Sequence, residues 1–238
     1  MSAGTSLFAG VRAAIIDLDG TMLDTAPDFL VAINAMRAEL QLAPVAIDII
    51  TGFVGKGTEN LVRSIIGLDF TPEQVSTHYE QALEAYMRHY SGINGKYSTL
   101  YPGVAEGLRA MQAQGLRLAC VTNKPIAFAL PLLEAAGLLP LFEVVYGGDS
   151  LPRKKPDPMP LLQVCADFSL APHKVVAIGD SSNDAQAARA AGCRVLNVPY
   201  GYNHGQPIRE VDSDGIVETL LDAARLLSAA NPYQHVSH

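Results

Sequence analysis

Two aspartates separated by a single residue are the strongest chemical feature of the sequence. Asp17 and Asp19 directly follow an apolar run at residues 13–16 and lead into a Gly-Thr turn. Carboxylates this close can face one small cavity, where their repulsion is costly unless a cation lies between them. Because hard oxygen ligands favour magnesium, the pair indicates a Mg²⁺ site beside a candidate nucleophile. Alone, an Asp-x-Asp pair is more often a solvated turn or a helix cap.

Two further polar groups suit a phosphate ligand. Thr122 and Asn123 follow an apolar run and precede a helix expected near Pro125, so their polar groups and the positive helix end can bind an anion. Lys155 lies in Lys-Lys-Pro-Asp-Pro at 154–158, where two prolines stiffen the backbone. A fixed ammonium there can neutralise phosphate charge in a transition state. Alone, these residues would be interpreted as helix caps and a surface lysine.

A second acidic pair lies in Gly-Asp-Ser-Ser-Asn-Asp at 179–184. Asp180 follows another apolar run and can complete a magnesium site whose first ligand is Asp17, although the segment alone is simply a reasonable helix start. Three of the four groups end an expected strand. Together they supply a nucleophile, metal ligands, phosphate ligands and a counter-charge, which is the inventory of an active site for phosphoryl chemistry.

The elements that must position these residues alternate along the chain. Short β-branched apolar runs suit strands covered on both faces, and they occur at 11–16, 116–121, 142–146, 175–178 and 195–198. Segments with helical spacing lie between them at 104–114, 126–136, 160–168 and 184–191, several ending at a glycine (Gly115, Gly137, Gly192). This alternation predicts an α/β fold, a Rossmann-like parallel sheet with helices on both faces. In such a sheet, chemistry collects beyond the carboxyl ends of the strands.

Residues 24–95 interrupt the alternation. They offer helical patterns at 29–40, 58–66 and 72–90 and no convincing strand. We therefore expect an all-helical insertion at 24–95 in a core formed by residues 1–23 and 96–238. Turn residues at Pro27 and at 91–95 favour hinged movement of the insertion. We expect the last residues, 231–238, to form a frayed tail.

The composition narrows the class of protein. The chain of 238 residues is 49% hydrophobic, and its 24 acidic residues outnumber 17 Lys and Arg, which argues against nucleic acid or an anionic membrane as the main partner. Cys120, Cys165 and Cys193 lie singly among apolar residues, which favours reduced thiols and a cytoplasmic location. No basic leader and no run of about 18 apolar residues is present, so we expect a soluble protein. We also expect a monomer or a homodimer whose partner is a small phosphorylated metabolite.

In their order along the chain, the four motifs resemble those of the haloacid dehalogenase superfamily. They are Asp17–Thr21, Thr122, Lys155 and Gly179–Asp184, and the resemblance covers nearly the whole chain. Within the superfamily the chain resembles the phosphoglycolate phosphatase group in four sequence segments, at 17–28, 121–125, 154–158 and 200–203.

The resemblance implies a role for each motif residue. Asp17 would be the nucleophile and a magnesium ligand, and Asp19 would act as general acid and then general base while its backbone carbonyl binds the metal. Thr122 and the backbone amide of Asn123 would hold the phosphoryl oxygens. The remaining residues would bridge nucleophile and phosphate (Lys155), bind Mg²⁺ (Asp180) and support the site from behind, by orienting the lysine (Asp184). The helical insertion would be a cap that closes over the cleft and selects the substrate.

Loop residues offer two further candidates. Lys56 lies in Gly-Phe-Val-Gly-Lys-Gly at 52–57, where it can contact a substrate carboxylate or be an exposed lysine on a flexible turn. His204 lies shortly after the Tyr-Gly-Tyr segment at 200–202. It is more simply interpreted as a surface-loop residue than as a residue at the edge of the site.

The resemblance thus implies a Mg²⁺-dependent phosphatase that forms a phospho-aspartate, with 2-phosphoglycolate as substrate. Phosphatases of sugar phosphates, nucleotides or pyrophosphate remain alternatives. A sugar phosphomutase is disfavoured by Thr21, where similar mutases often have a hydrophobic residue. A signalling receiver module is disfavoured because such modules are half this length and have a different order of acidic residues.

Overall fold

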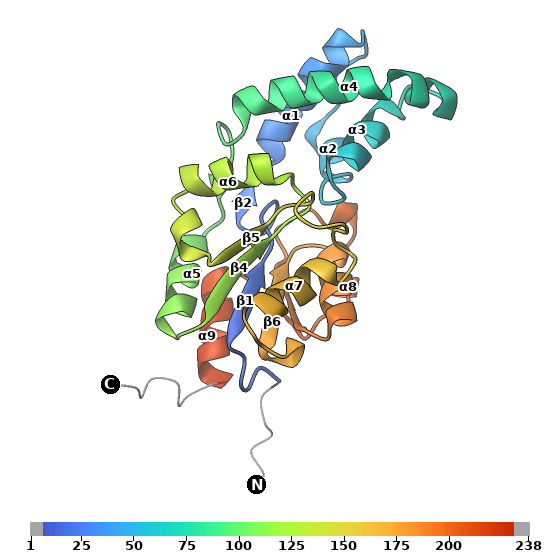
Figure 1. The fold of residues 1–238 in the computed structure, drawn as a ribbon. Coiled ribbons are helices and arrows are strands. Elements are labelled where there is room, and N and C mark those ends of the chain that lie inside the picture. Colours follow the sequence, from blue (N-terminus) through green and yellow to red (C-terminus); the bar gives the residue numbers. More distant parts are fainter. Residues whose placement is uncertain (1–6, 231–238) are drawn as a thin grey trace.

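The computed structural model describes residues 7–230 and places them in a sheet-and-helix core with a helical layer above it (Figure 1). The expected tail at 231–238 lies outside the described residues.

One six-stranded sheet forms the centre of the core. Its strands pair in the order β5-β4-β1-β6-β7-β8, and every pairing is parallel. The strands are β1 (Ala13–Ile16), β4 (Arg117–Val121), β5 (Val144–Tyr146), β6 (Val175–Gly179), β7 (Arg194–Asn197) and β8 (Gly215–Ile216). The predicted α/β class is confirmed. The two-residue β8 was not predicted, because so short a strand leaves no pattern in the sequence.

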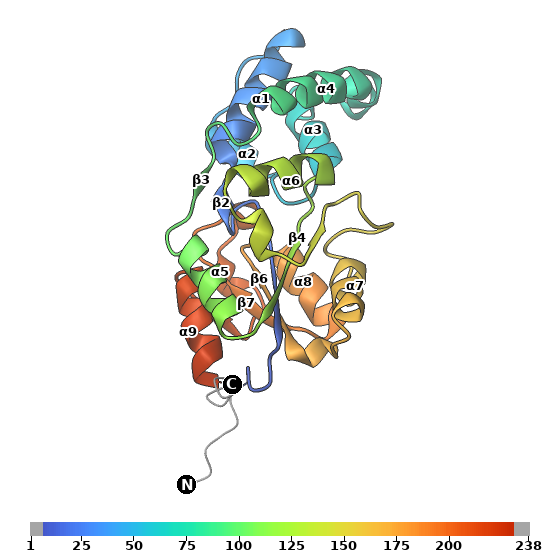
Figure 2. The same ribbon diagram turned by 60° about the vertical axis from the view of Figure 1, so that its left-hand side comes forward.

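Helices cover both faces of this sheet (Figure 2). Along β1, Ala14 and Ile16 face one hydrophobic cluster, and Ala13 and Ile15 face another, as the two-residue period of a strand requires. The first cluster includes side chains of α5 (Val104–Ala113), α6 (Ile126–Ala135) and α9 (Leu220–Ala230), and the second those of α7 (Met159–Asp167) and α8 (Ser182–Ala191). Short 3₁₀ turns lie at Leu139–Leu141, Pro172–Lys174, Asn203–Gly205 and Ile208–Glu210.

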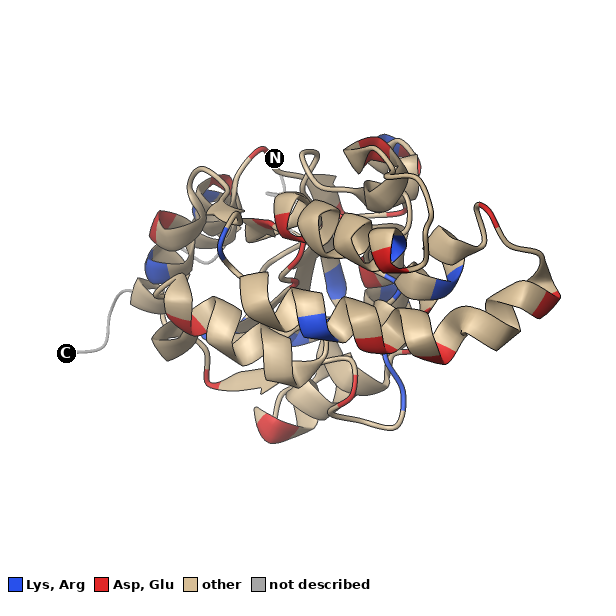
Figure 3. Cartoon of the chain, turned by 90° about the horizontal axis from the view of Figure 1, so that it is seen from above, with Lys and Arg blue, Asp and Glu red and all other residues tan. Residues whose placement is uncertain are grey.

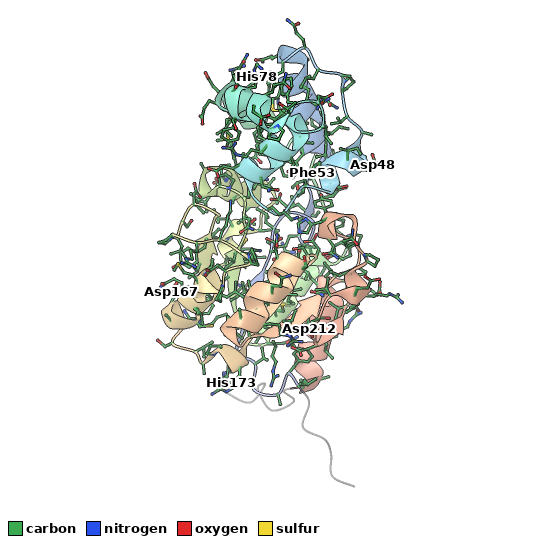
Figure 4. The ribbon with its side chains drawn as sticks, turned by 90° about the vertical axis from the view of Figure 1, so that its right-hand side faces the viewer. Asp48, Phe53, His78, Asp167, His173 and Asp212 are labelled. Atoms are coloured by element: carbon green, nitrogen blue, oxygen red, sulfur yellow. The ribbon has the colours of Figure 1, made fainter. Side chains whose placement is uncertain are left out.

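The layer above the core is helical. It contains α1 (Ala26–Glu39), α2 (Ile47–Thr51), α3 (Thr58–Ile66) and α4 (Pro72–Ile93). These helices share a hydrophobic cluster of their own, in which Ile33, Met36, Ile65 and Tyr86 are buried. Phe128 of α6 belongs to the same cluster, so the core supplies part of the surface against which the helical layer packs. Figure 4 shows Phe53 where the two parts meet, with His78 above it and Asp167 below.

Two short connections join the layers, and they differ from the sequence expectation. β2 (Leu23–Asp24) and β3 (Thr99–Leu100) pair antiparallel, although no strand was expected at either place. Pro27 lies in the first turn of α1 instead of in a linker, because its missing N–H has no partner to lose there. At the other end, α4 continues through Ser91 and Gly92, so the turn begins only at Asn94.

Partly buried hydrogen bonds tie these connections together. The carboxylate of Asp28, fully buried in α1, accepts hydrogen bonds from the backbone amides of Gly95 and Tyr97, each at 2.8 Å, and from the hydroxyl of Ser98. On the other side, the hydroxyl of Tyr202 donates to Asp24 and accepts from two backbone amides at the start of α1. Both ends of the helical layer are therefore held against the core.

The surface charges are mixed. Seen from above, Lys and Arg are scattered among Asp and Glu over both layers (Figure 3). Within residues 7–230, none of the helices combines the length and the apolar character needed to cross a bilayer. The three cysteines are buried free thiols, as predicted.

Candidate active site

The predicted motif residues meet at the carboxyl edge of the sheet. Asp17 follows β1, Thr122 follows β4 and Asp180 follows β6, and these three strands are neighbours. β1 lies where the strand order reverses, so a crevice opens beside its end. Lys155 reaches the same crevice from the loop between β5 and α7. The fold thus brings together residues that lie more than a hundred positions apart.

Lys155 is the centre of the charge network. Its ammonium, only 5% exposed, donates to Asp17 Oδ1 at 2.8 Å, to Asp184 Oδ1 at 2.6 Å and to the carbonyl of Val121 at 2.6 Å. Burial alone would lower the pKa of Lys155, but the two carboxylates raise it further than burial lowers it. The lysine is therefore charged and fixed beside Asp17.

Three carboxylates form an acidic cluster with room for a cation. One oxygen each from Asp17, Asp180 and Asp184 lies within 4.8 Å of the others. Burial, together with the neighbouring carboxylates, raises the pKa of Asp17 although Lys155 opposes the shift. Burial and the charge of Asp184 raise the pKa of Asp180 to about 7. Negative charge is thus under-compensated here, which is the condition a hard divalent cation relieves.

The carboxylate of Asp180 is held by two hydrogen bonds. Its Oδ1 accepts from the hydroxyl of Thr21 at 2.8 Å, and its Oδ2 accepts from the backbone amide of Tyr202 at 2.7 Å. Gly20 has a φ of +84°, and a Cβ there would lie 2.4 Å from Asp180 Oδ2. Only glycine therefore lets the turn after β1 approach this carboxylate. Because each oxygen of Asp180 accepts one hydrogen bond, each still has a lone pair with which to bind a metal.

Asp184 has two tasks, one for each oxygen. Its Oδ2 accepts hydrogen bonds from the amide and hydroxyl of Ser181, at 3.2 and 2.6 Å, which closes the first turn of α8. Its Oδ1 holds Lys155. The side chain is anchored by the helix start and so fixes the position of the ammonium, the geometry expected of a residue that supports the site from behind.

The anion-binding site expected around Thr122 differs from the sequence prediction in one respect. The Thr122 hydroxyl is buried and accepts from the backbone amide of Lys124 at 3.1 Å, which leaves its own proton free to donate. The first amide of α6, Ile126, donates instead to the carboxylate of Asp149. The helix end that was expected to bind the anion is therefore already capped by an acid.

A cavity between the two layers opens onto these residues. Core residues Asp17, Asp19, Thr122 and Lys155 line it together with side chains from the helical layer (Phe29, Val54, Leu61, Tyr86, Tyr90). The side-chain amide of Asn123 donates to the carbonyls of Gly55 and Lys155, at 2.9 and 2.8 Å. Asn183 also donates to the Gly55 carbonyl, at 3.1 Å. The loop 52–57 is thus fastened over the core.

Lys56 itself does not enter this cavity. Its side chain is exposed, whereas its neighbours Gly55 and Gly57 line the wall. His204 lies partly buried beside Gly55, and burial together with the charge of Lys56 lowers the pKa of the imidazole. It too is absent from the lining.

Sequence reasoning missed the roles of Lys124 and Tyr90. The ammonium of Lys124 is buried and donates to Asp19 Oδ1 at 3.0 Å and to the hydroxyl of Tyr90 at 2.6 Å. The sequence analysis assigned no role to Lys124, although its place directly after a strand end was a usable signal. Tyr90 gave none, because an aromatic residue on an amphipathic helix is ordinarily part of the core.

Comparison with known proteins agrees with this architecture. Residues 11–192 match the family model of haloacid dehalogenase-like hydrolases. A phosphoglycolate phosphatase of Nitrosospira multiformis is 50% identical over 93% of this chain and 97% of its own. One of Thiobacillus denitrificans is 44% identical over 92% and 97%.

Solved structures show the same fold. A crystal structure described as a predicted phosphoglycolate phosphatase from Haemophilus somnus superposes with a TM-score of 0.86 at 32% identity, covering 92% of this chain and 98% of the other. The superfamily predicted from the motifs is confirmed. This chain belongs to the haloacid dehalogenase-like hydrolases and is a phosphoric monoester hydrolase.

Proposed function

We propose that this protein hydrolyses 2-phosphoglycolate to glycolate and phosphate, with Asp17 as nucleophile and Mg²⁺ as cofactor. The contact that carries the proposal is that of Lys155 with Asp17, 2.8 Å across the crevice, beside two further carboxylates. A fixed cation next to an under-compensated acidic cluster suits a reaction in which one anion attacks another.

In the first step, a carboxylate oxygen of Asp17 attacks phosphorus and the bond from phosphorus to the ester oxygen breaks. Asp19 donates its proton to that oxygen, so the product leaves as an alcohol. Lys155, the Thr122 hydroxyl and the Asn123 backbone amide stabilise the phosphoryl oxygens. Among the described residues that amide has no hydrogen-bond acceptor, so it is available. Bound Mg²⁺ would neutralise charge on the phosphoryl group and on the carboxylates.

In the second step, Asp19 takes a proton from water as the water oxygen attacks phosphorus. The acyl phosphate bond to Asp17 breaks, and the free carboxylate is restored. Asp19 can serve both steps because it lies in the cavity lining, two residues beyond the nucleophile. The carboxylates of Asp17 and Asp180 and the backbone carbonyl of Asp19 would hold the metal, with Asp184 fixing Lys155 behind them.

The helical layer, residues 24–95, would act as the cap. Hydrogen bonds from Asn123 and Asn183 to the Gly55 carbonyl hold it closed over the cavity, and an apolar wall of Phe29 and Leu61 keeps water from the phospho-aspartate. Substrate entry requires these bonds to open, so the cap would separate from the core in each turnover.

Two observations favour 2-phosphoglycolate over other esters. Both curated relatives described above carry that activity in their names, and the chain covers 97% of each. The space inside the cavity is narrow, which suits a metabolite of few atoms better than a nucleotide. Because its three thiols are buried and free, we also propose that the protein acts in the cytoplasm.

A phosphate-release screen with and without Mg²⁺ tests the proposal. The panel should hold 2-phosphoglycolate, a hexose phosphate, a nucleoside monophosphate and pyrophosphate, with sugar isomerisation followed in parallel. We expect the highest kcat/KM with 2-phosphoglycolate. Without a divalent cation we expect no phosphate release from any of the esters. A clear preference for another member of the panel, or an isomerised sugar without phosphate release, would reject this substrate assignment.

A further inference from the structure

Lys124 is a buried charge that the two hydrolytic steps do not use. Its ammonium lines the cavity, and its side chain is only 3% exposed. We propose that Lys124, held by Tyr90, is the specificity-determining residue that binds the carboxylate of the substrate's leaving group. This inference rests on the proposed function, because it assumes that the leaving group is a small hydroxy acid.

The hydrogen bonds of Lys124 leave one donor available. An ammonium has three N–H groups, and two of them are directed to Asp19 Oδ1 and the Tyr90 hydroxyl. The third has no acceptor among the residues that the structure describes. Its nitrogen also lies 4.7 and 4.8 Å from the ring centres of Phe29 and Tyr90. The faces of these two rings stabilise the positive charge but do not take up the third N–H.

The other ammonium in the cavity lining cannot take this role. Lys155 already directs its three N–H groups to Asp17, Asp184 and the Val121 carbonyl. The exposed Lys56 lies outside the lining. Within the described part of the chain, Lys124 is therefore the only lining ammonium with an N–H still free for a ligand.

The distances place this donor beside the leaving group. Asp19, as general acid, must lie within hydrogen-bond reach of the ester oxygen, and Lys124 lies 3.0 Å from Asp19 Oδ1. Two linked hydrogen bonds span at most about 6 Å. In 2-phosphoglycolate only one methylene separates the ester oxygen from the carboxylate, so that carboxylate comes within reach of the ammonium.

The surroundings make the contact selective. Aromatic and aliphatic side chains line the cavity together with Lys124 (Phe29, Leu61, Tyr86, Phe128). In such a setting an ionic hydrogen bond is stronger than in water, and a neutral group at the same place would leave the donor unsatisfied. A substrate with a carboxylate is thereby favoured over one with an alcohol of the same length.

The test compares two esters that differ only in that group. They are 2-phosphoglycolate and 2-hydroxyethyl phosphate, in which a hydroxymethyl group replaces the carboxylate. The proteins are the wild type, Lys124→Met, and the matched control Lys174→Met. Methionine is flexible and packs well against aromatic rings, so the fold should persist. Lys174 is exposed in the 3₁₀ turn before β6, at the opposite edge of the sheet from the site.

We expect the ratio of kcat/KM values, acid over alcohol, to fall about 10- to 100-fold in Lys124→Met, the worth of one charged hydrogen bond. The ratio should be unchanged in Lys174→Met and should fall less in Tyr90→Phe, which keeps the charge but loses its anchor. Equal losses with both esters in Lys124→Met would overturn the inference, because Lys124 would then act only by positioning Asp19.

Dissociation constants measured on proteins that also carry Asp17→Asn make the result independent of turnover. The ratio of these dissociation constants, acid over alcohol, should rise when Lys124 is replaced, because the acid then binds relatively more weakly. An unchanged ratio would again reject the inference. If the wild type hydrolyses neither ester, the proposed function fails, and the binding ratio alone then decides whether Lys124 selects carboxylates.

Discussion

The ammonium of Lys155 lies 2.8 Å from Oδ1 of Asp17, although 138 positions of sequence separate the two residues. The position of the lysine is fixed, because its ammonium also donates hydrogen bonds to Asp184 and to the carbonyl of Val121 at the end of β4. A charge fixed before the substrate arrives costs no reorganisation during the reaction.

Replacement of Lys155 by Met should lower kcat about 10²- to 10³-fold, because it removes the charge that we propose stabilises the phosphoryl oxygens. Steady-state kinetics with 2-phosphoglycolate at saturating Mg²⁺ would measure the effect. Lys174→Met, which also removes one positive charge but lies far from the cavity, should retain full activity. A kcat for Lys155→Met equal to that of the control would show that this contact has no part in the chemistry.

Strand ends and the four motifs were predictable because each depends on local sequence. The runs before Asp17, Thr122 and Asp180 are apolar and β-branched, and such runs form buried parallel strands. The short β2 and β3 were not predictable, since two-residue strands form only when distant segments meet. The pairing of Lys124 with Tyr90 depends on how a helix of the upper layer rests on the core, which no local pattern records.

Magnesium should stabilise the protein more at high pH than at low pH. Burial and the charge of Asp184 raise the pKa of Asp180 to about 7, well above the ordinary value for an aspartate. Without metal, the folded state therefore binds a proton that the unfolded chain has lost. This group stabilises the fold fully below about pH 4, and the contribution disappears as the pH rises to about 7.

Because Mg²⁺ would have to displace that proton, it should bind the folded protein weakly below about pH 7. The increase in Tm on adding Mg²⁺ to chelator-treated protein should accordingly be larger at about pH 8 than at about pH 5.5. The variant Asp180→Asn should show little increase at either pH. An equal increase at both values in the wild type would argue against a buried carboxyl that titrates at the metal site.

Asp28→Ala should destabilise the protein by about 3 kcal/mol. The change removes the buried carboxylate that accepts hydrogen bonds from the backbone amides of Gly95 and Tyr97, and it leaves both amides without their acceptor. Urea unfolding gives the free energy directly. Asp48→Ala, on the exposed side of α2 (Figure 4), is the matched control and should change stability by less than about 0.5 kcal/mol. If the two variants were equally stable, Asp28 would not be the residue that ties the connections together.

The rate of phosphate release by Asp17→Asn tests the central assignment most directly. An amide is a far poorer nucleophile than a carboxylate, so the protein should fold, bind Mg²⁺ weakly and release phosphate at least about 10⁴-fold more slowly than the wild type. Release within about tenfold of the wild-type rate, with folding unchanged, would mean that the reaction does not pass through a bond from phosphorus to this side chain.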